Sequence, residues 1–157
     1  MTSAPQEKST GIIIFGWLII VSSLLQMHKL LIDKNWYFET YSYMPLWLVY
    51  CRYAFSWFQR IAGITAAVGA LFCKEWGRKL LVLIGAFTII TVYWKHPLVG
   101  FKNHALYLDR VMPSLTQEFT FESLAFYSMI THIILDILFQ STLIYYFTRR
   151  HVKQQFS

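Results

Sequence analysis

Four long apolar runs, separated by short polar stretches, make up most of this chain. A helix needs about 20 mostly apolar residues to cross a bilayer, and each run comes close to that length. The pattern therefore predicts an all-α fold: a single membrane domain, residues 11–148, built as a bundle of four transmembrane helices. Residues 1–10 and 149–157 are expected to be tails, the second of them basic. The expected spans are residues 11–32, 45–73, 79–95 and 121–148.

Local signals support these boundaries. The first run, GIIIFGWLIIVSSLLQMHKLLI, is longer than the apolar part of a signal peptide and lacks a small-residue cleavage site at its end, which indicates a retained span. Pro45 suits the first turn of the second helix, and Pro97 ends the third. The third run is short for a span, so Lys95 and the aromatic residues beside it would have to reach the membrane interface.

Composition and charge agree with a membrane location. Apolar residues make up 56% of the chain and charged residues 14%, whereas soluble domains are roughly one quarter charged. The net charge of +6 does not indicate a nucleic-acid partner, because the cations flank the apolar runs. The positive-inside rule places the two densest basic groups, and with them both termini, in the cytoplasm. These groups are Lys74, Arg78 and Lys79, at the connection between the second and third expected spans, and Arg149, Arg150 and Lys153 near the C-terminus.

The fourth run carries a polar stripe within the sequence SMITHIILDILFQS, residues 128–141. Ser128, His132, Asp136 and Gln140 follow one another at intervals of four, so they share one face of a helix. Ionisable residues at membrane depth face the bundle interior or a water-filled cavity rather than lipid. The stripe is therefore expected to face the other helices.

Asp136 falls near the middle of its helix, where an unpaired charge costs at least a few kcal/mol. Arg60 lies near the middle of the second helix, and a guanidinium can bind a carboxylate through two hydrogen bonds. The sequence thus predicts an Arg60–Asp136 pair near the midplane, with His132 roughly 6 Å closer to the outer face. Such a pair can also serve only to hold two helices together. Polar residues expected nearby are Gln26, Gln59, Thr88, Thr91 and Gln140.

The two cysteines do not indicate a disulfide or a metal site. Cys51 and Cys73 lie 22 residues apart, which is roughly 33 Å along one helix and beyond the reach of a disulfide. Neither belongs to a CxxC pair, and no cluster of metal-ligating residues stands out in the sequence.

The stretch FQRIAGITAAVGALFCKEWGRKLLVLIGAFTIITVYW resembles a hairpin found in small uncharacterised bacterial inner-membrane proteins. Its features are an apolar helix rich in small residues, a short basic turn of the form Lys-x-Trp-x-Arg-Lys-Leu, and a second apolar helix. Here the turn is Lys74-Glu-Trp76-Gly-Arg78-Lys79-Leu80. The resemblance implies a multi-pass protein of the bacterial inner membrane, and it supplies no catalytic residues.

Three functions are compatible with these features. The favoured one is an accessory or structural subunit that binds other membrane proteins, or copies of itself, within the bilayer. The second is proton or solute transport by an oligomer that uses Arg60, His132 and Asp136. The third is binding of b-type haem by His28 and His132, although di-haem cytochromes have more membrane histidines. An enzyme is not favoured, because no P-loop, nucleophile elbow or HExxH zinc helix is present.

Overall fold

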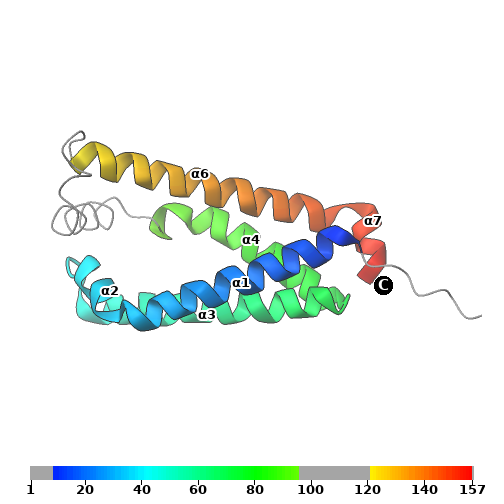
Figure 1. The fold of residues 1–157 in the computed structure, drawn as a ribbon, viewed down its shortest axis with the longest axis horizontal. Coiled ribbons are helices and arrows are strands. Elements are labelled where there is room, and N and C mark those ends of the chain that lie inside the picture. Colours follow the sequence, from blue (N-terminus) through cyan, green and yellow to red (C-terminus); the bar gives the residue numbers. More distant parts are fainter. Residues whose placement is uncertain (1–8, 96–120, 157) are drawn as a thin grey trace, which may run out of the picture.

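The computed structural model describes residues 9–95 and 121–156, and these residues are helical apart from short turns (Figure 1). The expected all-α fold class is confirmed. Within the described residues, two helices are long and apolar enough to cross a membrane, namely α1 and residues Phe126–Thr148 of α6. The long helices are α1 (Thr10–Ile32), α3 (Leu46–Leu71), α4 (Glu75–Lys95) and α6 (Phe121–Thr148), and the short ones are α2 (Lys34–Thr40), α7 (Arg150–Lys153) and the 3-10 helix η2 (Gln154–Phe156).

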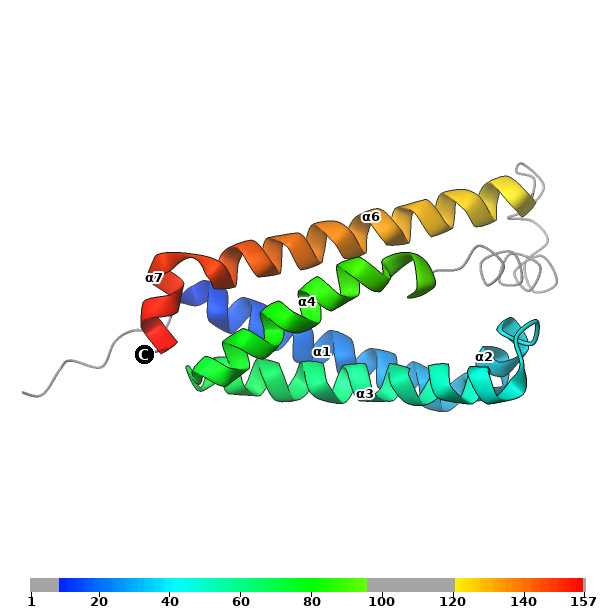
Figure 2. The same cartoon turned by 180° about the vertical axis from the view of Figure 1, so that it is seen from behind.

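The four long helices form a wedge rather than a parallel bundle. α1 packs on α3, α3 on α4, and α4 on α6. α1 and α6 meet where α1 begins and α6 ends, and they diverge toward the other end (Figure 1, Figure 2). At the closed end the ring of Phe15 contacts Phe139, Tyr146 and Phe147. The hydroxyl groups of Ser9 and Tyr146 also lie 2.6 Å apart there.

The hydrophobic core lies at this closed end. Ala66, Ala67 and Ala70 of α3 are fully buried in it, and their small side chains let the neighbouring helices approach closely. Larger residues fill the remaining space, and Phe147 has no exposed surface. The other buried members of this core are Ile12, Ile19, Leu81, Leu143, Val152 and Phe156.

A tight turn joins α3 to α4. Lys74 N–H donates to the Gly69 carbonyl at 2.8 Å and Cys73 N–H to the Ala70 carbonyl at 2.9 Å, the pattern of a Schellman motif. Cys73 takes the left-handed position of that motif with φ of 52°. α4 then starts at Glu75, four residues before the expected start at Lys79, because a carboxylate suits the first turn of a helix.

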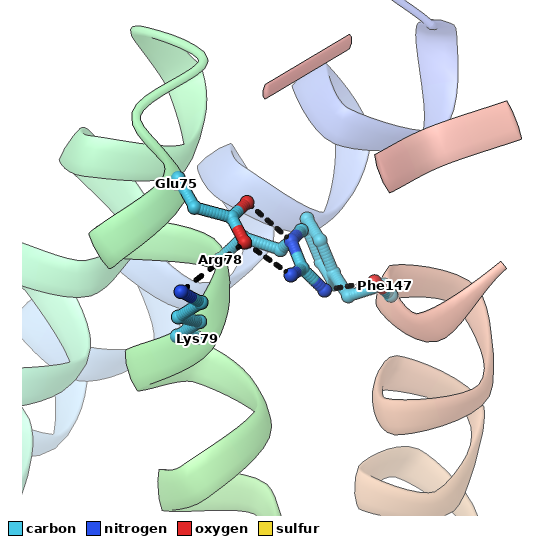
Figure 3. Close-up of polar contacts among 4 residues, drawn as sticks. All are labelled: Glu75, Arg78, Lys79 and Phe147. Carbon is cyan, nitrogen blue, oxygen red and sulfur yellow. Dashed lines mark hydrogen bonds and ion pairs between the residues drawn. The ribbon is translucent and has the colours of Figure 1, made fainter. Parts of the chain in front are cut away.

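Arg78 connects this turn to the end of α6 (Figure 3). Its Nε and Nη2 donate to the two carboxylate oxygens of Glu75 at 2.7 and 2.5 Å, and its Nη1 donates to the Phe147 carbonyl at 3.1 Å. These hydrogen bonds lower the pKa of Glu75 to about 2, so the pair stays ionised at neutral pH. Arg78 therefore supplies a donor to a carbonyl in the last turn of α6, where helices leave carbonyls unpaired.

The segment expected to be a basic tail, residues 149–157, is instead packed against the core as far as Phe156. Val152 and Phe156, four residues apart, are buried, and the Phe147 and Phe156 rings contact each other. Gln155 Oε1 accepts a hydrogen bond from Ser9 N–H at 2.9 Å, just before α1 begins. The basic residues occupy the exposed side of this segment, and its apolar side covers the core.

At the open end, the aromatic stretch between the first two long helices contains the short helix α2. Tyr37 of α2 is buried with Leu30 of α1 and Val49 of α3. The Tyr53 hydroxyl donates to the Leu30 carbonyl at 3.1 Å, which satisfies an acceptor in the last turn of α1. Residues 97–120, which connect the third and fourth expected spans, lie outside the described residues.

Replacing Gly77 by alanine is expected to lower the free energy of unfolding by about 1–3 kcal/mol. A Cβ atom there would lie 2.5 Å from the Ala70 nitrogen and the Gly69 carbonyl carbon, which are backbone atoms and cannot move aside easily. Gly63→Ala is the matched control, since its nearest contact would be Ser23 Oγ at 3.5 Å. Thermal unfolding of both variants in detergent measures the difference, and equal melting temperatures would contradict the close approach.

Candidate functional site

A cavity of about 390 Å³ lies among the four long helices. Leu81 and Leu143, which belong to the core, form part of its wall, so the cavity begins where the packed end of the wedge stops. Ser22 and Ser23 of α1 line it as well. The structure also brings six of the residues singled out in the sequence to this cavity: Gln26, Gln59, Arg60, Thr88, Asp136 and Gln140.

Arg60 of α3 and Asp136 of α6 bring opposite charges to the cavity. The Arg60 Nη1 group donates to the Ser56 carbonyl at 2.6 Å. The Arg60 Nε atom is buried and has no hydrogen-bond partner within the described residues. Asp136 is half-buried in the same cavity, and its charge interacts with that of Arg60. The two residues therefore line a common space, and one buried donor of Arg60 is left without a hydrogen bond within the described residues.

Amide and hydroxyl side chains surround the two charges. Gln59 Nε2 donates to Thr88 Oγ1 at 3.4 Å, and Thr88 is buried. Gln140 lies beside Gly85, where a Cβ atom would come within 3.2 Å of its Oε1 atom. The missing side chain at Gly85 thus leaves room for Gln140 on the wall formed by α4 and α6.

Two of the expected residues, His132 and Thr91, are not among those lining the cavity. The His132 side chain is exposed, and its Nδ1 lies 2.8 Å from the Ser128 carbonyl of the same helix. The Thr91 hydroxyl donates to the Phe87 carbonyl at 2.8 Å. An interval of four residues advances a helix by about 400°, so a stripe at that spacing turns by about 40° at each step. The polar stripe therefore turns away from the cavity toward the N-terminal end of α6.

The two histidines proposed as haem ligands do not form a site in this cavity. His28 and His132 both have exposed side chains, and neither belongs to the cavity wall. In the described ranges, 9–95 and 121–156, no group of three or more His, Cys, Asp or Glu residues is arranged to hold a metal ion. Bis-histidine haem ligation at the cavity thus does not fit the placement of these residues.

The sequence interpretation missed the role of Arg52. This arginine is buried at 4% exposure near the open end, and its guanidinium lies 4.4 Å from the centre of the Tyr41 ring. It also donates to the Tyr41 hydroxyl at 3.3 Å. Burial raises the pKa of the neighbouring Tyr37, which keeps that hydroxyl neutral. The density of tyrosines before α3 was the available signal, since arginine binds well to aromatic faces.

Comparison with family models, curated proteins and solved structures finds no match to this chain. The likeness of the α3–α4 hairpin to bacterial inner-membrane proteins therefore stays a prediction.

Reversing one charge in the cavity is expected to lower the amount of folded protein, because like charges would then face each other there. Arg60→Asp or Asp136→Arg alone should each lower the free energy of unfolding by on the order of 3–5 kcal/mol. The double variant restores opposite charges and should recover most of the protein, measured by quantitative immunoblot of membranes. His132→Ala, outside the cavity, is the control and should stay near the wild-type level. A double variant no better than either single one would contradict the interaction.

Proposed function

We propose that this chain is a multi-pass protein of the bacterial inner membrane, with four spans and both termini in the cytoplasm. α3 and α4 lie alongside the two apolar helices and have 26 and 21 residues. At 1.5 Å per residue these are about 39 and 31 Å long, enough for a hydrocarbon core of about 30 Å. The exposed cations Lys74, Lys79, Arg149 and Arg150 gather at the closed end, which supports a cytoplasmic position for that end.

Its proposed role is that of an accessory subunit that binds another membrane protein in the bilayer. The observation that carries this proposal is the polar cavity at the place where α1 and α6 part. Hydrocarbon beside Arg60 and Asp136 would be costly, and a transmembrane helix across the gap between α1 and α6 would exclude it. We assign this place to a different subunit; a two-fold dimer, in which Arg60 of each copy would face Asp136 of the other, is the alternative that crosslinking distinguishes.

Transport receives less support from the wedge. Leu81 and Leu143 are almost completely buried beside the cavity, and Phe147 is fully buried beyond them. The polar side chains of the cavity therefore end at an apolar core at the closed end. His132, part of the proposed relay, has an exposed side chain outside the cavity. A transport cycle would need the core to open, whereas binding a partner needs no such change.

A photo-crosslinking amino acid at Leu18 is expected to capture one discrete partner in living cells. Leu18 of α1 lines the cavity and is 48% exposed, so a reactive group at this position lies at the cavity and is accessible from outside. Ile90 on α4 is more exposed, at 81%, but lies off the cavity and provides the control position. Gel electrophoresis and mass spectrometry identify the adduct.

The proposal requires an adduct with a different membrane protein from position 18 and none of that size from position 90. An adduct between two copies of this chain would assign the gap to self-association instead. The same adducts from both positions, or none from position 18, would contradict a specific partner surface.

A further inference from the structure

The cavity has the size and lining of a site for a small molecule. Its volume of about 390 Å³ falls within the range of ligand pockets, roughly 300–1,000 Å³. Such pockets combine mostly apolar walls with a few polar groups that orient the ligand. Here the apolar wall is the surface of the core, with Leu81, Ile84, Phe139 and Leu143.

The charged groups of the cavity restrict which ligand it can take. Arg60 lines the cavity from α3, and its guanidinium stays protonated, so the cavity attracts an oxyanion. Asp136 lines the same cavity from α6 and would repel a ligand that carried only negative charge. A ligand that carried only positive charge would be repelled by Arg60 in the same way. The cavity therefore suits a ligand with both signs of charge close together.

The polar and apolar parts of the lining occupy different levels of the wedge. Leu81 lies six residues from the start of α4 and Leu143 five from the end of α6, both near the closed end. Arg60 and Asp136 lie near the middle of their helices, farther from that end. A ligand that fits both levels has an apolar group at one end and its charged groups at the other.

We propose that this cavity binds a small zwitterion with an apolar side chain, the chemistry of a free apolar α-amino acid. Its carboxylate accepts hydrogen bonds from Arg60, and its ammonium group donates to Asp136. The apolar side chain lies against Leu81, Ile84 and Leu143, and the amide of Gln59 lies within the same lining. This site goes beyond the proposed role as a subunit and needs no partner protein.

The test compares three probes that share one apolar group. L-leucine has both charges, 4-methylpentanoate lacks the ammonium group, and L-leucinamide lacks the carboxylate. Isothermal titration of the full chain, purified in mild detergent, should give saturable binding of L-leucine with a Kd below about 1 mM. Each analogue loses one charged hydrogen-bond partner and should bind about tenfold more weakly, or worse.

Variants connect the binding to the cavity. Arg60→Gln should weaken L-leucine binding but strengthen the weak binding of L-leucinamide, because its ammonium group no longer meets the positive charge of Arg60. Gly63→Leu fills the cavity without removing a charge, so it tests the site even where Arg60→Gln does not fold. Thr65→Ala is the control, because Thr65 is exposed on α3 and its hydroxyl bonds to its own helix. The control variant should bind L-leucine as the wild type does.

Three outcomes would overturn the proposal. The first is no saturable binding of L-leucine, and the second is unchanged binding by Gly63→Leu. The third is equally tight binding of 4-methylpentanoate, which would make this a site for anionic amphiphiles. The titration uses the isolated protein, so its failure leaves the crosslinking result on the partner unaffected.

Discussion

The close approach of helices at one end of the bundle is the constraint on which the rest of this structure depends. Gly77 lets the first turn of α4 lie against the backbone of α3, and the alanines of α3 keep its contact face flat. Arg78 then holds the end of α6 through the Phe147 carbonyl (Figure 3). With one end held so tightly, divergence of α1 and α6 can create space only at the other end. The cavity begins where the packed closed end stops.

In the cavity, the free-energy cost of removing two charged groups from water is set against the attraction between them. A guanidinium and a carboxylate lose hydration when they are buried, and their attraction compensates only when the geometry is good. Arg60 Nη1 donates to the Ser56 carbonyl, and its buried Nε makes no hydrogen bond within the described residues. A buried donor without a partner costs roughly 1–3 kcal/mol, whereas the charge of Arg60 at the cavity favours an oxyanion there. The same arginine is thus a weakness of the isolated fold and a basis for binding.

The all-α fold and most helix positions were predictable from the sequence because they follow from the lengths of apolar runs. The position of Arg60 and Asp136 in one cavity also agrees with their similar depth along two helices. His132 shows where such an argument ends. Spacing along α6 gives a face, but it does not reveal that the helices diverge and that the face turns away. That information lies in long-range packing.

The early start of α4, the packed C-terminus and buried Arg52 were missed for a related reason. In the first two cases charged residues were read as a membrane-orientation signal, and Arg52 was given no partner. Glu75 and Arg78 neutralise each other, and Arg52 lies over the Tyr41 ring. Val152 and Phe156 bury the apolar side of a basic segment. Charge marks a solvated surface only when no partner is available, and partners are set by the tertiary structure.

Distances between spin labels on α1 and α6, measured by pulsed electron paramagnetic resonance, test the wedge most directly. One pair, at Leu31 and Tyr127, reports on the open end, and a second pair, at Ile14 and Thr142, on the closed end; all four side chains are exposed. The labels are placed in a protein without its two native cysteines. The wedge predicts a clearly longer distance for the Leu31–Tyr127 pair. Equal distances for the two pairs would mean that α1 and α6 run parallel, and that the cavity does not open between them.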